Sequence, residues 1–77
     1  MTVTLSSCGN PDYGQDTNKG VSPKRKVRVA SLEEASEACL EYINLYSLGG
    51  GNWSGGMVEQ GGKQVARISY NGRAQPV

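Results

Sequence analysis

Two cysteines and a series of glutamates are the side chains of this sequence that could take part in covalent or acid–base chemistry. Cys8 lies in the segment SSCGN, but a cysteine nucleophile needs an activating base, and the 77-residue sequence contains no histidine. The glutamates recur at helical spacing, on the side of a helix where carboxylates stay solvated and are poorly suited to acid–base catalysis. The sequence therefore predicts a protein that is not an enzyme.

The two cysteines also give no sign of a metal site. Cys8 and Cys39 are far apart and do not form a metal-ligand spacing. A disulfide between them would require an oxidising compartment, so we expect free thiols. No metal and no cofactor are expected.

The first charged feature is acidic. Between Ser31 and Glu41 the sequence has four glutamates and no lysine or arginine. The three that repeat every fourth residue are Glu33, Glu37 and Glu41. Carboxylates at this spacing repel one another on a helix, and the helix dipole explains only those in the first turn. They predict either an ordinary solvated helix face or a stripe that docks on a basic partner.

The second charged feature is basic and is hidden by the net charge of +1. The segment from Thr17 to Arg28 carries five positive residues and no negative one. Its dense part consists of Lys24, Arg25, Lys26 and Arg28. If Lys26 and Arg28 point away from the helix, they share an open sheet face with Lys63 and Arg67. Such a face could bind phosphates, or it could only guard strand edges against aggregation.

These charges must be positioned by a helix and several strands. Ser31 and Glu34 form a capping-box pattern at the start of a helix that we expect to end near Ser47, with Gly49 in the left-handed conformation beyond it. The apolar stripe of this helix comprises Ala35, Ala38, Cys39, Tyr42, Ile43 and Tyr46.

Alternating apolar residues predict strands over 2–6 and 26–30. Gly61-Gly62 predicts a hairpin turn that sets Met57 opposite Ala66 and Trp53 opposite Tyr70. In that register, the core face of the hairpin carries Met57, Ala66, Ile68, Tyr70 and Trp53.

Together these elements predict an α+β fold, with a small, mainly antiparallel sheet of about four strands, one helix on one face and a ββαββ order. Residues 1–77 form a single domain, 7–25 a long irregular loop and 73–77 a tail. The sequence has no membrane-spanning run and no secretory signal, so we expect a cytoplasmic protein.

Four segments of the chain resemble small proteins encoded by phages and mobile elements of Gram-negative bacteria. The segments are SSCGNPDYGQD, VASLEEASEACLEYI, LGGGNWSGG and VARISYNGR. Some small proteins of this origin are anti-CRISPR inhibitors. The resemblance implies a non-catalytic protein that binds a subunit of a type I CRISPR effector in a bacterial host. It would then block target DNA binding or nuclease recruitment. The resemblance assigns no contact residue.

Two docking modes remain open under this hypothesis. In the acidic mode, Glu33, Glu37 and Glu41 face a DNA-binding groove of the effector. In the basic mode, Lys24, Arg25, Lys26 and Arg28, with Arg67, face guide RNA or the target backbone. The alternative is a small nucleic-acid-binding accessory protein of a mobile element, and a third possibility is a plain interaction module. In each case we expect a monomer or a weak dimer.

Overall fold

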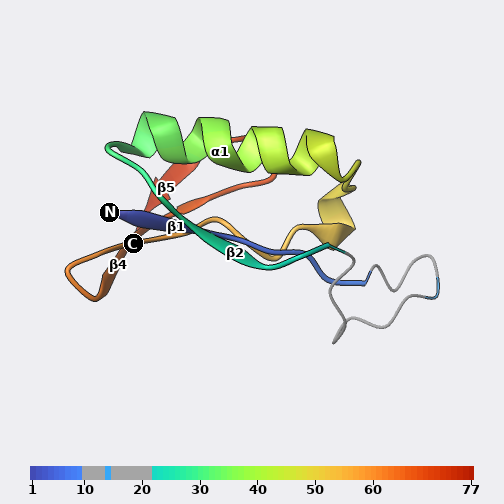
Figure 1. The fold of residues 1–77 in the computed structure, drawn as a ribbon, viewed down its shortest axis with the longest axis horizontal. Helices are drawn as coiled ribbons and strands as arrows, with labels where there is room; N and C mark the ends of the chain where they lie inside the picture. Colours follow the sequence, from blue (N-terminus) through green and yellow to red (C-terminus); the bar gives the residue numbers. More distant parts are fainter. Residues whose placement is uncertain (10–13, 15–21) are drawn as a thin grey trace.

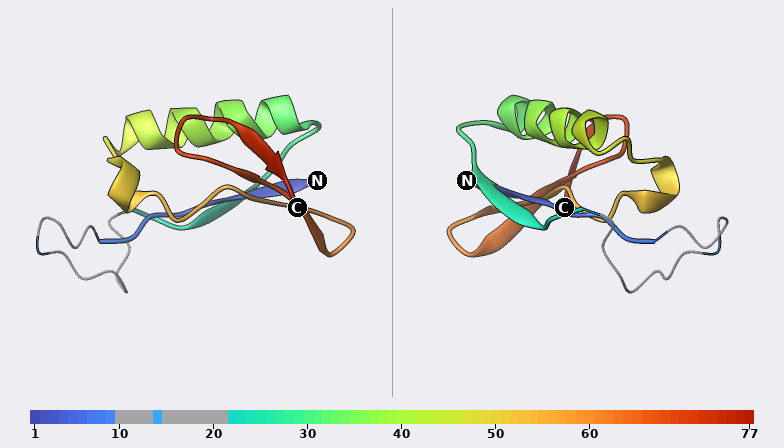
Figure 2. Two further views of the ribbon diagram at one scale, coloured as in Figure 1. Left: turned by 180° about the vertical axis from the view of Figure 1, so that it is seen from behind. Right: turned by 45° about the vertical axis from the view of Figure 1, so that its right-hand side comes forward.

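The computed structural model describes residues 1–9, 14 and 22–77, which form one antiparallel sheet covered by one helix. The strands are β1 (Thr2–Leu5), β2 (Arg25–Arg28), β3 (Met57–Gln60), β4 (Lys63–Ile68) and β5 (Ala74–Pro76). The helix is α1 (Leu32–Leu45), and the 3₁₀ turn η2 (Gly50–Asn52) follows it. The sheet order is β2-β1-β3-β4-β5. The helix lies on one side of the sheet in every view (Figure 1; Figure 2).

The predicted α+β class and the ββαββ order are confirmed, but the sheet has five strands rather than about four. The fifth strand replaces the predicted tail. A turn at Asn71-Gly72 reverses the chain, with the Gly72 N–H donating to the Ser69 carbonyl at 2.9 Å. Ala74–Pro76 then pairs with β4 at the edge of the sheet, where a proline is tolerated because its missing N–H faces solvent.

The helix begins as its sequence predicts. Ser31 is extended, and its hydroxyl accepts a hydrogen bond from the Glu34 N–H at 3.1 Å. Along the helix, Ala35, Cys39, Tyr42 and Ile43 are buried against the sheet. This face follows the predicted apolar stripe.

The end of the helix differs from the prediction. Ser47, with φ of 51°, takes the left-handed conformation, whereas Gly49 has φ of −87°. The Leu48 N–H reaches the Ile43 carbonyl at 3.0 Å and the Ser47 N–H reaches the Asn44 carbonyl, which is the Schellman pattern. Leu48 is buried. Burial of Leu48 fixes the position of the turn, so the left-handed conformation falls on Ser47 and not on Gly49.

The β3–β4 hairpin has the predicted turn but not the predicted register. Gly61 and Gly62 both have positive φ, as a type I′ turn requires. A bulge between Val58 and Glu59 then shifts the pairing by one residue, so that Val58 faces Ala66. Val58 is therefore fully buried, while Met57 is 42% exposed. The prediction that Met57 belongs to the core was wrong for this reason.

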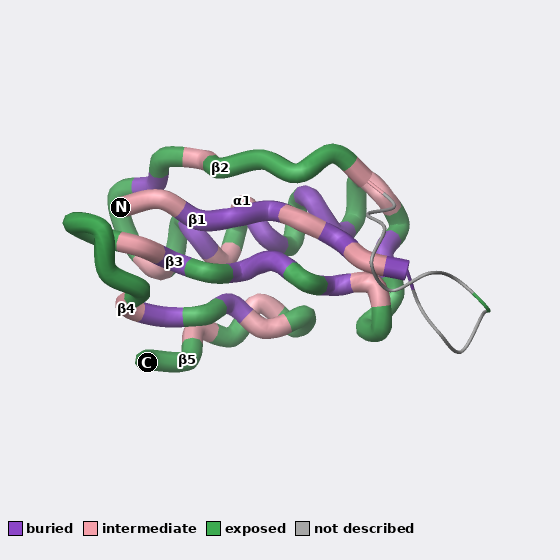
Figure 3. The backbone as a smooth tube through the Cα atoms, turned by 90° about the horizontal axis from the view of Figure 1, so that it is seen from below, coloured by how far each residue is buried: buried purple, intermediate pink, exposed green. Residues whose placement is uncertain are grey.

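The core lies between the helix and the covered face of the sheet. Its buried apolar residues are Val3, Leu5, Val29, Ala35, Cys39, Tyr42, Ile43, Leu48, Trp53, Val58, Ala66 and Ile68. Trp53 closes the end of the core near η2, and its ring lies 6.1 Å from that of Tyr42. The opposite face of the sheet is not covered by any described element (Figure 3).

Trp53 and Tyr70 do not pair with each other as predicted. Trp53 forms an isolated bridge with Ser7, and its indole N–H donates to the Ile68 carbonyl at 3.0 Å. Tyr70 is 40% exposed and uses its hydroxyl to bond the Leu48 carbonyl at 2.9 Å. Trp53 is thus a core residue, whereas Tyr70 braces the loop that follows the helix.

The predicted loop over 7–25 lies mainly outside the described residues. At its two ends, Ser7 bridges to Trp53 and Arg25 is the first residue of β2. No helix among the described residues is both long and apolar enough to cross a membrane.

Candidate binding surfaces

The acidic surface lies on the solvent side of α1 and is made by Glu33, Glu37 and Glu41, all of which are exposed. The last turn of the helix contains no basic residue. Throughout the described part of the chain, no lysine or arginine forms an ion pair with any of the three. The helix therefore presents a row of carboxylates that no described lysine or arginine neutralises.

The basic surface lies on the open face of the sheet. In β2, Lys26 and Arg28 alternate with Arg25 and Val27 and stand opposite Thr4 and Thr2 of β1. In β4, Arg67 stands opposite the exposed Met57 on this face, whereas Lys63 stands opposite Gln60 and lies on the other face from Glu59 and its partner Gln64. The prediction that Lys63 shares the open face was wrong, because the bulge breaks the alternation along β4. The open face thus gathers three cations, two from β2 and one from β4.

One of these cations is partly neutralised. Lys26 Nζ lies 3.5 Å from Glu59 Oε1, and the Lys26 side chain is 62% exposed. An exposed ion pair of this kind contributes little to stability, about 0–1 kcal/mol. Lys26, Arg28 and Glu59 border a shallow hollow of about 410 Å³ together with Thr2 and the β3–β4 turn.

The structure separates two residues of the predicted basic group from this face. Lys24 is exposed and precedes β2. Arg25 pairs with Leu5, whose side chain is in the core, so the Arg25 side chain lies on the helix side of the sheet. The alternation of side chains along a strand causes this split, because neighbouring residues face opposite sides.

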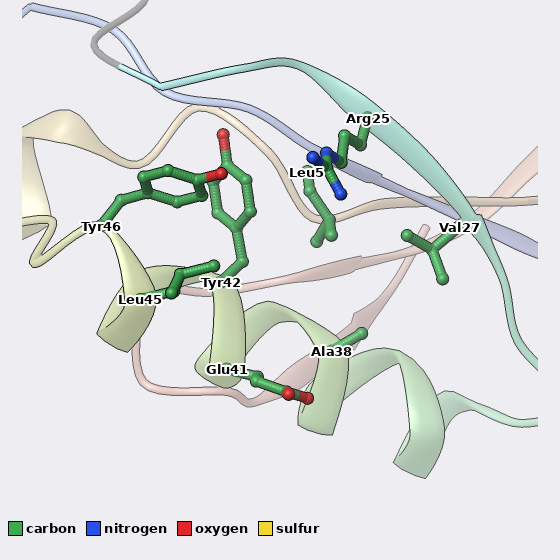
Figure 4. Close-up of a pocket in the computed structure, with 8 residues that line it drawn as sticks. All are labelled: Leu5, Arg25, Val27, Ala38, Glu41, Tyr42, Leu45 and Tyr46. Atoms are coloured by element: carbon green, nitrogen blue, oxygen red, sulfur yellow. The ribbon is translucent and has the colours of Figure 1, made fainter.

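Arg25 lines a groove between β2 and α1 that the sequence did not predict. The groove holds about 270 Å³ and is lined by Leu5, Arg25, Val27, Ala38, Glu41, Tyr42, Leu45 and Tyr46. Figure 4 shows the Arg25 side chain reaching over Leu5 toward the helix, with Leu45 and the two tyrosines across from it. Arg25 and Glu41 line the same groove without forming an ion pair.

Two sequence signals were available for this groove. Val27 is the one apolar residue among the cations of β2, so the strand has an apolar position on the side opposite Lys26 and Arg28. Leu45 lies beyond the predicted apolar stripe and is 72% exposed in the structure. Neither signal identifies a groove until the distance between β2 and α1 is known.

The cysteines are free thiols in different surroundings. Cys39 is fully buried, and burial raises its pKa to about 12. Cys8 is half-buried, and its Sγ donates to the Gly51 carbonyl oxygen at 3.6 Å. Within the described residues, no group of three or more metal-ligating side chains comes together.

Comparison with known proteins finds no matching family model, no similar curated protein and no similar solved structure.

Proposed function

We propose that the chain is a non-catalytic anti-CRISPR inhibitor that binds a subunit of a type I CRISPR effector and blocks target DNA binding or nuclease recruitment. The resemblance to small phage and mobile-element proteins supports this class of function. It follows that the protein works in the cytoplasm of a bacterial host, as a monomer or weak dimer.

The observation that carries the proposal is the unneutralised row of Glu33, Glu37 and Glu41. Like charges at this spacing destabilise a helix by about 0.2–0.5 kcal/mol per pair. A protein of 8.2 kDa has little stability to spare for such repulsion. A surface that binds nucleic acid must be basic, so the effector supplies a complementary partner for a carboxylate row. We therefore assign docking to the acidic face of α1.

Copurification from a host that carries a type I effector tests the proposal, together with a plaque assay of phage protection. The wild-type chain should copurify with an effector subunit and protect the phage. The double variant Glu37→Lys with Glu41→Lys should do neither, whereas Lys63→Glu with Arg67→Glu, a matched charge reversal in β4, should do both. No effector subunit in the wild-type eluate, with no protection of phage, would refute the proposal.

A second candidate function is direct nucleic-acid binding by an accessory protein of a mobile element. The cations on the uncovered sheet face favour it, namely Lys26, Arg28 and Arg67. Phosphate contacts make binding fall steeply as salt rises. Under this alternative the free protein shifts DNA or RNA in a gel at low salt, and Lys26→Glu with Arg28→Glu abolishes the shift. Absence of any shift at low salt excludes it.

A further inference from the structure

The strand β2 is an edge strand, and within the described part of the chain it pairs with β1 on one side only. Its sheet neighbour is β1, and the Val29 N–H donates to the Met1 carbonyl at 2.9 Å. In an antiparallel ladder, hydrogen-bonded pairs alternate with non-hydrogen-bonded pairs. Counting back from Val29 and Met1, the N–H and C=O groups of Lys26 and Arg28 point away from β1. No described residue occupies this edge.

The two sides of this edge differ in chemistry. On the helix side lies the groove of about 270 Å³, where Val27, Leu45 and Tyr46 offer apolar surface. On the open side lie the charged side chains of Lys26 and Arg28. A strand added to β2 would send alternate side chains to these two sides, because the side-chain period of a strand is two residues. Its favoured sequence therefore alternates apolar and acidic residues.

Charge also decides what kind of strand fits. Four cations lie at or beside the edge, namely Lys24, Arg25, Lys26 and Arg28. Glu59 forms an ion pair with only one of them, Lys26. A second copy of the chain would set these cations against the same cations, which is unfavourable for directly opposed strand residues. An acidic strand would neutralise them. Cations that only protect an edge from aggregation do not require an apolar groove beside them.

We propose that the free edge of β2 binds an extended, acidic segment of a partner protein by strand addition, with apolar side chains of that segment in the groove between β2 and α1. This inference rests on the proposed function in one respect, which is that the chain acts by binding protein. It assigns a second contact, separate from the carboxylate row of α1, and it specifies the partner segment by its chemistry.

The probe for this site is a capped ten-residue peptide with glutamate at every second position and valine or threonine between. NMR titration of the wild-type chain should move the backbone amide signals of Lys26 and Arg28 and the methyl signals of Val27 and Leu45. A control peptide with lysine in place of every glutamate should bind at least tenfold more weakly. Equal binding of the two peptides would overturn the proposal, as would shifts centred on Lys63 and Arg67.

Backbone methylation of the peptide distinguishes strand addition from simple charge attraction. Two further peptides carry N-methyl groups on one or the other alternate set of residues. Because alternate N–H groups of a strand point to opposite sides, one methylated peptide should lose binding and the other should keep it. If both bind like the parent peptide, no strand is added and the inference fails.

A matched pair of variants tests the edge from the protein side. Lys26→Pro removes the outward N–H without removing a hydrogen bond to β1, whereas Lys26→Gln removes only the charge. We expect Lys26→Pro to weaken peptide binding at least about fivefold beyond Lys26→Gln, as the loss of one or more backbone hydrogen bonds implies. Equal affinities of the two variants would overturn the inference. If Lys26→Pro fails to fold, the methylated peptides decide the question with the wild-type chain.

The outcomes separate this inference from the proposed function and from other occupants. Glu33→Lys with Glu37→Lys, which leaves the groove-lining Glu41 in place, should bind the acidic peptide as the wild type does. Peptide binding without effector binding refutes the proposed function alone, and effector binding without peptide binding refutes the inference alone. Two other outcomes would assign the edge to a different occupant and overturn the inference. One is dimerisation of the chain through β2. The other is an oligonucleotide that displaces the peptide, seen as reversal of the peptide-induced shifts of the Val27 and Leu45 methyl signals.

Discussion

Two glycines near the single tryptophan have opposite structural roles. Gly56 has φ of +96°, and a Cβ placed on it would lie 2.1 Å from the Ile68 carbonyl oxygen. The Gly56 N–H also donates to the Thr4 carbonyl at 2.7 Å. Gly50 lies in η2, where an added Cβ would meet nothing closer than the Tyr70 ring at 3.8 Å. Gly56 is therefore required by the sheet, whereas packing does not require Gly50.

Alanine substitutions should separate these two glycines. Gly56→Ala should lower the free energy of unfolding by about 3 kcal/mol or more, because left-handed strain adds to the steric overlap with Ile68. Gly50→Ala should change it by less than about 1 kcal/mol. Urea unfolding followed by the fluorescence of Trp53 measures both. Similar losses for the two variants would contradict this account of the glycine-rich segment.

The buried thiol of Cys39 gives the protein a stability that depends on pH. Burial raises its pKa from 9.0 to about 12, so the folded state binds this proton more tightly than the unfolded state. The contribution of the protonated Cys39 thiol to the free energy of unfolding is complete below pH 9.0, and it is lost as the pH rises toward about 12. The expected loss is at most about 1.4 kcal/mol per pH unit.

Comparison with Cys39→Ala isolates this effect from the titration of lysines and tyrosines. Between pH 9 and 11 the free energy of unfolding of the wild type should fall more steeply than that of the variant. Chemical denaturation at a series of pH values provides the measurement. Parallel curves would show that the Cys39 thiol does not favour the protonated form in the folded state.

At the scale of elements, α1 combines a well-formed start with an unfavourable outer face. The Ser31 cap stabilises the first turn, and the buried face supplies the packing that holds the helix on the sheet. Glu33, Glu37 and Glu41 oppose this stability through mutual repulsion. The helix should therefore be more stable, but a weaker binding element, when the repulsion is relieved.

Glu37→Lys tests this balance. It replaces two repulsive i,i+4 pairs by two attractive ones, so the free energy of unfolding should rise by about 0.8–2 kcal/mol. Effector binding should fall at the same time. Glu37→Gln is the matched control, with about half the gain in stability. Thermal or urea unfolding measures the gain, and a decrease in stability for Glu37→Lys would mean that Glu37 makes a favourable contact in the folded protein.

The elements also show which parts of the fold the sequence could predict. The helix start was predictable because a capping residue and an apolar period act locally. The hairpin register was not predictable, because the alternation of apolar and polar residues along a strand does not reveal the one-residue bulge next to Val58. The left-handed Ser47 depends on the burial of Leu48, and β5 depends on the free edge of β4. Both are tertiary effects.

The same distinction holds for the candidate surfaces. The carboxylate row follows from spacing along one helix, so the sequence sufficed to name its residues. The basic group is a cluster along the chain, but β2 distributes it between two faces, with Arg25 on the helix side and Lys26 and Arg28 on the open side. The groove and the free edge of β2 required the sheet order, which local patterns do not encode.

At the scale of the whole molecule, the two layers carry opposite charge. The helix and the sheet form the two layers (Figure 1). The outer face of α1 is acidic, and the open face of the sheet carries Lys26, Arg28 and Arg67. A net charge of +1 therefore coexists with a strong separation of charge across the two layers. Such a molecule is oriented by the field of a charged partner before contact, and it presents its acidic layer to a basic surface.

The affinity of the purified chain for a type I effector complex, measured at low and at physiological salt, tests the central claim most directly. We expect the wild type and Lys63→Glu with Arg67→Glu to bind the effector, and Glu37→Lys with Glu41→Lys to bind at least tenfold more weakly. Added salt should weaken the wild type more than the helix variant, because screening removes the contribution of the carboxylate row. Equal affinity of the wild type and the helix variant, or no binding of the wild type at low salt, would contradict the account.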